Sequence, residues 1–88
     1  MYRSFFEMEE YLATETARHI ERLGMSGMTP DSSPYPIKGT KRQKQTWLIH
    51  NAEYANDLLC KMRNVGRKSI AEFYRTLDLE TKTVLIRM

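Results

Sequence analysis

The glycines and prolines between residues 24 and 39 most limit what this 88-residue chain can fold into. Three prolines stand at positions 30, 34 and 36, and each one fixes φ, removes a backbone donor and restricts the residue before it. We therefore predict a Pro/Gly-rich internal loop over residues 24–39, either functional or mobile, with residues 26–37 as its most mobile part. Tyr35 and Ile37 are available to anchor this loop to a core, and the sequence leaves open whether they do.

Helical periodicity marks the segment before this loop, from Ser4 to about Leu23. Ser4 and Glu7 have the spacing of a capping box, in which each side chain bonds the backbone amide of the other residue. Apolar side chains recur at helical spacing, interrupted by Thr16, at Phe5, Met8, Leu12, Ile20 and Leu23. The segment is predicted to be one helix that buries its apolar face.

The segment after the loop carries the same periodicity in shorter pieces. Thr40 is placed to cap a helix, and apolar residues continue at helical spacing from about residue 41 to 62. We favour a break at His50-Asn51, with Asn51 capping a second helix, over one continuous helix. A further helix is predicted from residue 68 or 69 to about 77.

The end of the chain allows two interpretations. Asp78 is placed to cap a last short helix through residues 83–87, although Thr81, Thr83 and Val84 would also suit a strand. With or without this element, the pattern predicts an all-α fold of four or five short helices around one core. At this length we expect a single small helical domain over residues 1–88.

Composition excludes several classes of protein. No apolar run approaches the roughly 18 residues that a membrane span needs, and the N-terminus turns acidic at Glu7, too soon for a signal peptide. The single cysteine, Cys60, cannot close an internal disulfide, and we expect it to be buried on its helix. A reducing, cytoplasmic location and no membrane association are expected.

Residues that would support catalysis or metal binding are not grouped in the sequence. His19 and His50 have no carboxylate or cysteine at ligand spacing, and no nucleotide loop, carboxylate pair or triad pattern is present. Trp47 is expected to be a central core residue. We therefore predict a protein that is not an enzyme, with no catalytic residues, no metal and no cofactor.

Charge is distributed unevenly along the chain, whose net charge is +3. Residues 1–37 hold three arginines against six acidic residues, whereas residues 38–75 hold nine lysines and arginines against three acidic residues. A basic middle attached to an acidic start indicates a surface that faces a polyanion on one part of the fold. The simpler interpretation is a solvated basic face that aids solubility.

The most informative segment is the turn between two apolar, helix-periodic stretches at residues 61–77. Asn64 is the non-glycine residue that best tolerates a left-handed backbone, and Gly66 permits positive φ and close approach of another backbone. Val65, between them, is placed to fill the gap between the two helices. This arrangement predicts a helix–hairpin–helix over residues 51–77, with its hairpin at residues 63–67.

A helix that begins near Ser69 would leave its first amides without an internal partner. Those amides and the helix dipole attract anions, and the cations Arg63, Arg67 and Lys68 stand beside them. A phosphate group uses free amides, a hydroxyl and flanking cations together. An ordinary pair of helices with a glycine turn and solubilising basic residues is the alternative.

Residues 61–72 resemble the helix–hairpin–helix of the C-terminal domain of the bacterial RNA polymerase alpha subunit, which has a segment of the type Asn-Leu-Gly-(Lys/Arg)-Lys-Ser-Leu-x-Glu. In that family the hairpin and an earlier helix grip DNA across the minor groove, mostly through phosphates, and the domain also touches transcription activators. The resemblance places the family's hairpin glycine on Gly66, its phosphate-binding lysine on Lys68, its serine on Ser69 and its glutamate on Glu72.

The earlier helix of the family also has a counterpart, in residues 14–25. The family's groove-entering arginine falls on Glu15, and its asparagine falls on Arg18. The resemblance therefore implies a phosphate grip with little sequence readout, on an accessory or derived member of the family. The residues expected to contact nucleic acid are Arg18, Arg63, Asn64, Gly66, Arg67, Lys68, Ser69 and Glu72.

Two functions follow as expectations. The first is a small DNA-binding protein, transcription-related or accessory to a mobile element, that binds duplex DNA with low sequence specificity and has RNA polymerase or another transcription protein as a possible partner. The second is a protein–protein interaction module that docks on transcription machinery or a host factor, with its basic surface meeting an acidic partner.

Overall fold

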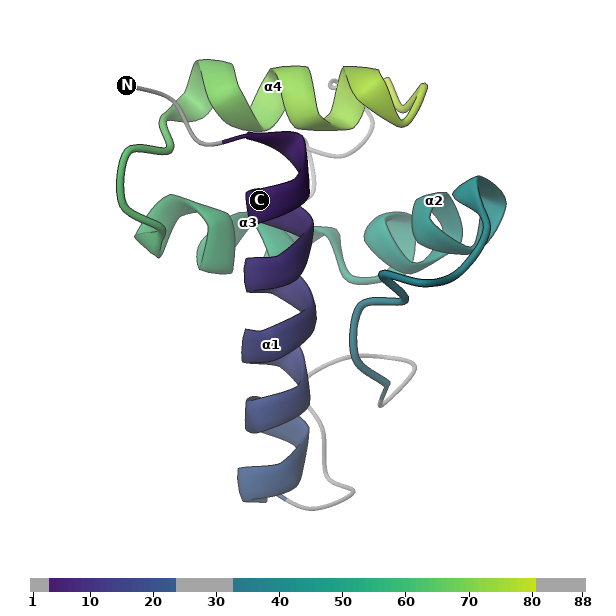
Figure 1. The fold of residues 1–88 in the computed structure, drawn as a ribbon, viewed down its shortest axis with the longest axis vertical. Coiled ribbons are helices and arrows are strands. Elements are labelled where there is room, and N and C mark those ends of the chain that lie inside the picture. Colours follow the sequence, from purple (N-terminus) through teal and green to yellow (C-terminus); the bar gives the residue numbers. More distant parts are fainter. Residues whose placement is uncertain (1–3, 24–32, 81–88) are drawn as a thin grey trace.

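The computed structural model describes residues 4–23 and 33–80. Four α-helices lie in these ranges, and no strand does: α1 (Phe5–Leu23), α2 (Lys41–His50), α3 (Ala52–Lys61) and α4 (Arg67–Thr76) (Figure 1). The all-α prediction is confirmed for this part of the chain. The element predicted at residues 83–87, and residues 26–32 of the segment predicted to be most mobile, lie outside the described residues.

Capping boxes begin the first two helices; the sequence predicted the box at Ser4 and, for the second helix, a cap by Thr40. The Glu7 amide donates to Ser4 Oγ at 3.2 Å, and the Ser4 amide donates to Glu7 Oε1 at 3.3 Å. At α2 the Gln43 amide donates to Thr40 Oγ1 at 3.1 Å, and the Thr40 amide donates to Gln43 Oε1 at 2.8 Å. Two of the amides at each of these helix ends therefore have side-chain partners.

The predicted break at His50-Asn51 is also confirmed, but Asn51 acts differently from the prediction. Its side chain makes no capping bond to α3. Instead, the Asn51 side-chain amide and its backbone N–H both donate to the Trp47 carbonyl, each at 2.9 Å. Asn51 therefore caps the C-terminal end of α2. The carbonyls in the last turn of a helix lack partners within the helix, and Asn51 supplies donors to the Trp47 carbonyl.

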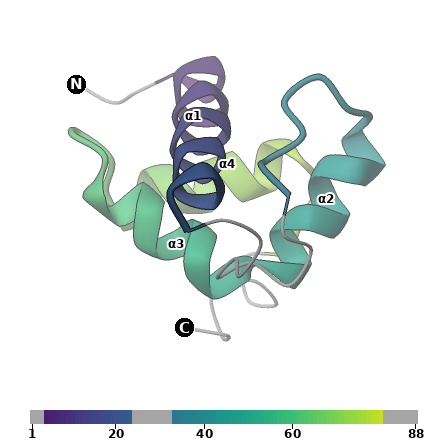
Figure 2. The same cartoon turned by 90° about the horizontal axis from the view of Figure 1, so that it is seen from below.

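The core lies where α1 crosses α3 and where α4 packs on α3 (Figures 1 and 2). Leu12, Leu48, Ala55 and Leu59 are fully buried there, and Trp47 is 3% exposed, which confirms it as a core residue. The other buried apolar residues are Met8, Tyr35, Ala52, Ile70, Phe73, Tyr74 and Leu77. In the described ranges no helix has both the length and the apolar character needed to cross a membrane.

Tyr35 anchors the described end of the internal loop to this core. It is 2% exposed, its backbone amide donates to Thr16 Oγ1 at 2.9 Å, and its hydroxyl donates to Glu9 Oε2 at 2.6 Å. Lys44 of α2 pairs with the same carboxylate oxygen at 2.7 Å. Thr16, which interrupts the apolar stripe of α1, is thus the acceptor that holds the loop, and its own hydroxyl donates to the Leu12 carbonyl at 2.6 Å.

Two further predictions about single residues are wrong. Cys60 is exposed, because the buried face of α3 is formed by positions 52, 55, 56 and 59. Asp78 does not begin a new helix. It adopts φ 58° after α4, and the amides of Asp78 and Leu79 donate to the carbonyls of Arg75 and Tyr74 at 3.0 and 2.9 Å. This pattern is a Schellman motif, which ends a helix through a left-handed residue.

Candidate functional site

The connection between α3 and α4, residues 62–66, reverses the chain through one left-handed residue. That residue is Asn64, with φ 63°. Gly66 has φ −110° and ψ −177°, an extended backbone that any residue adopts, so the expectation of positive φ at Gly66 is wrong. Asn64 supplies the left-handed turn instead, because its short polar side chain tolerates that region best among non-glycine residues. Val65 is partly buried against the core, as predicted.

Gly66 is the N-cap of α4, and no side chain caps this helix. The amides of Arg67, Lys68 and Ser69 therefore have no partner inside the helix, since its first backbone bond runs from the Ile70 amide to the Gly66 carbonyl at 3.1 Å. A Cβ placed on Gly66 would meet nothing within 4 Å. The N-terminus of α4 is thus open to a ligand, and the helix dipole favours an anion there.

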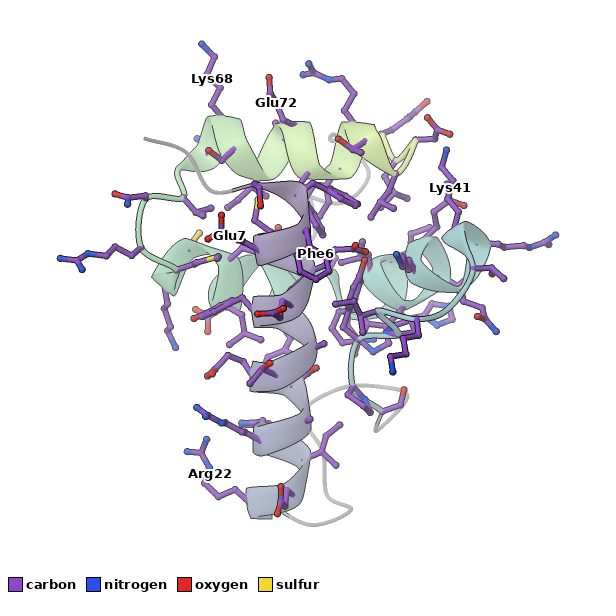
Figure 3. The ribbon with its side chains drawn as sticks, viewed as in Figure 1. Phe6, Glu7, Arg22, Lys41, Lys68 and Glu72 are labelled. Carbon is purple, nitrogen blue, oxygen red and sulfur yellow. The ribbon has the colours of Figure 1, made fainter. Side chains whose placement is uncertain are left out.

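Basic side chains surround this open helix end. Arg67 and Lys68 are exposed, and neither makes an ion pair with any other described residue. Lys68 projects outward from the first turn of α4, away from the rest of the molecule (Figure 3). Arg63 is also exposed on the connection, and Lys61 is engaged by Asp57 at 3.1 Å. Arg67 and Lys68 therefore provide positive charge beside the free amides, without an ion-pair partner in the part of the chain that the structure describes.

Two further residues of the predicted site lie on α4 itself. Ser69 is 7% exposed, and its hydroxyl is buried with no hydrogen-bond partner among the described residues. That hydroxyl does not face the solvent with the free amides, so Ser69 can offer an anion its backbone N–H only. Glu72 lies one turn beyond Lys68 and points outward on the same side of α4 (Figure 3). Its carboxylate lowers the positive potential along that side.

Arg18 is not brought together with the other predicted residues. It is exposed on α1 and pairs with Glu15 at 3.4 Å. Arg22, one turn further along α1, lies at the end of the molecule opposite to Lys68 (Figure 3). The residues that the structure places together are those of the α3–α4 connection and the first turns of α4.

Sequence analysis did not anticipate how the basic run at residues 41–44 is used. Lys44 pairs with the buried carboxylate of Glu9, and Lys41 pairs with Asp78 beyond the end of α4. The acidic N-terminal part and the basic middle of the chain therefore neutralise each other in part within the fold. The sequence around Lys44 gave no local signal of its pairing with Glu9, because Glu9 lies 35 residues earlier in the chain.

Comparison with known proteins found no relative of this chain: no protein-family model, no curated protein and no solved structure matches it.

Proposed function

We propose that the chain is a small DNA-binding module that grips the phosphate backbone with α3, α4 and their connection, acting as a helix–hairpin–helix. The observation that carries this proposal is the uncapped N-terminus of α4, with Arg67 and Lys68 exposed beside it and in no ion pair with another described residue. A phosphate oxygen placed at this end accepts from the free amides of the first turn, while Lys68 and Arg67 neutralise its charge.

Binding in this way contacts the DNA phosphates and makes no base-specific contacts. Glu15 occupies the position where the resembling family has its groove-entering arginine, and Arg18 is paired with it. A carboxylate is repelled from the electronegative minor groove. Glu72, next to Lys68 along α4, further limits the attraction. We therefore expect weak, sequence-tolerant binding of duplex DNA whose affinity depends strongly on salt.

The experiment that tests this function is a titration with random-sequence and A·T-rich duplexes at about 50 and about 200 mM salt. Lys68→Ala is compared with Lys38→Ala, an exposed lysine that lies before α2 and makes no ion pair among the described residues. If Lys68 contacts a phosphate, its removal lowers the slope of log affinity against log salt by roughly one unit, and removal of Lys38 leaves the slope nearly unchanged.

The alternative function, a protein-interaction module, gives a different result. Any DNA retention would then be diffuse, so Lys68→Ala and Lys38→Ala would weaken it equally. A wild-type affinity that does not change between the two salt concentrations would contradict the phosphate mechanism altogether.

A further inference from the structure

A groove lies between the loop segment 33–36 and α2. This loop segment and α2 lie on a different part of the molecule from the N-terminus of α4 (Figure 1). Its volume is about 510 Å³. Pro34 and Pro36 line one side, and Arg42, Gln43, Thr46 and Trp47 line the other. We call this feature the Trp47 groove.

The walls of the Trp47 groove are fixed by contacts to the core. Tyr35 lies between the two prolines and is tied to α1 through its amide and its hydroxyl. The Trp47 indole N–H donates to the Ser33 carbonyl at 2.9 Å, and the Trp47 ring meets the Tyr35 ring edge-on at 5.4 Å. Proline also keeps the backbone before it extended. The groove is therefore preformed, so a ligand is spared much of the entropy cost of ordering it.

Among the described residues that line the groove, Arg42 is the charged one. It is exposed and makes no ion pair with another described residue. A guanidinium group binds a carboxylate through two parallel hydrogen bonds, and proline rings accept apolar side chains. The lining thus matches a ligand that carries a carboxylate next to an apolar group.

We propose that the Trp47 groove binds an extended acidic segment of a partner protein, with a carboxylate on Arg42 and a neighbouring apolar side chain against Pro34 and Pro36. A peptide fits the groove better than a nucleic acid does. The capping box of Thr40 and Gln43 already satisfies amides at the N-terminus of α2, and one arginine is a poor substitute for a row of phosphate contacts.

The two proposed ligands do not compete for the same surface. Lys41, at the start of α2, and Lys68, at the start of α4, lie at opposite ends of α4 (Figure 3). The peptide site stands on the groove and does not depend on the DNA-binding proposal.

The test uses two short synthetic peptides, one that alternates Glu with Leu and Phe, and one in which Lys replaces each Glu. Trp47 is the chain's one tryptophan, so its fluorescence and its indole N–H resonance report on the groove. We expect the acidic peptide to shift both signals in the wild type. Arg42→Glu should weaken that binding by about tenfold or more and should favour the basic peptide instead.

Lys38→Glu is the matched control, because it makes the same change of charge outside the groove lining. Equal weakening by the two variants would show diffuse attraction and overturn the proposal. Unchanged Trp47 signals on addition of the acidic peptide would overturn it too. Duplex DNA affinity that falls more with Arg42→Glu than with Lys68→Glu would make the groove a nucleic-acid site, and so also contradict the assignment.

Discussion

At the scale of single residues, the two glycines beside helix starts have opposite requirements. A Cβ on Gly39 would lie 2.6 Å from Gln43 Oε1 and 3.2 Å from the Pro36 carbonyl oxygen. The Gln43 oxygen is engaged in the capping box of α2, so it cannot move without losing its bond to the Thr40 amide. A Cβ on Gly66 meets nothing within 4 Å, and the backbone there is extended.

Gly39→Ala should therefore lower the free energy of unfolding by about 1 kcal/mol, the value of a lost cap. Gly66→Ala should change it by less than about 0.5 kcal/mol, because the poorer N-cap is offset by the lower entropy of the unfolded chain. Urea unfolding followed by circular dichroism measures both. A larger loss for Gly66→Ala than for Gly39→Ala would contradict this description of the two turns.

The same contrast shows what the sequence could and could not predict about the site. The pattern Asn-Val-Gly between two periodic stretches correctly predicted a turn there, and it named both candidates for positive φ. Whether Asn64 or Gly66 takes the positive φ depends on how α3 and α4 pack against each other, and the local sequence does not determine that packing. The burial of the Ser69 hydroxyl likewise follows from the direction in which α4 packs, and could not be read from its place beside Lys68.

At the scale of elements, Tyr35 joins the loop before α2 to α1. Its hydroxyl donates to Glu9, and its amide donates to Thr16. Tyr35→Phe removes the hydroxyl bond to a buried carboxylate, so we expect the free energy of unfolding to fall by about 1–3 kcal/mol. Thermal and urea unfolding measure the change.

Tyr54→Phe is the matched control for Tyr35→Phe. The Tyr54 hydroxyl is buried with no partner among the described residues, and its ring keeps its contact with His19 in the variant. Loss of the Tyr54 hydroxyl should leave the free energy of unfolding nearly unchanged or raise it. Equal destabilisation by the two variants would mean that the bond to Glu9 does not hold the loop.

Helix boundaries were the most predictable part of the fold. The capping box at Ser4, the cap at Thr40 and the break at Asn51 are local signals, and each was predicted from neighbouring residues. The burial of Glu9 was not predictable in this way. An acidic residue near the start of a helix is expected to be exposed and to be stabilised by the helix dipole. Glu9 is buried instead, and its carboxylate is bound by Lys44 and Tyr35, which lie far from it in the sequence.

At the scale of the whole molecule, two buried tyrosines contribute most to the change in stability of the fold at high pH. Burial is the main cause that raises the pKa of Tyr35 above its ordinary value of 10.0, and the hydrogen bond to Glu9 adds to it. Burial also raises the pKa of Tyr74, whose hydroxyl donates to Asn56 Oδ1. In the unfolded chain both groups ionise near pH 10, whereas in the fold their raised pKa keeps them neutral to a higher pH.

A folded-state pKa above the unfolded one contributes stability that is fully present below pH 10 and is lost as the pH rises beyond it. We therefore expect the free energy of unfolding to fall steadily above about pH 10, and to fall less steeply in Tyr74→Phe than in the wild type. Urea titrations at several pH values measure the slope. Ionisation of all five tyrosines near pH 10, with circular dichroism unchanged, would contradict the burial of these two side chains.

The central claim, that the open N-terminus of α4 holds a phosphate, is tested most directly by Gly66→Asp. An aspartate at this N-cap would bond the free amides, so the fold should become more stable by about 0.5–1 kcal/mol. The same carboxylate would occupy the anion site and repel a phosphate, so affinity for duplex DNA should fall by about tenfold or more.

The matched control is Thr40→Asp, which adds the same charge at the N-cap of α2, a helix end whose amides are already bonded. The measurement is the affinity of both variants and the wild type for one duplex at a single low salt concentration. We expect higher stability with a large loss of DNA affinity in Gly66→Asp, and only a small loss in Thr40→Asp. Equal losses of affinity in the two folded variants would remove the N-terminus of α4 from the mechanism.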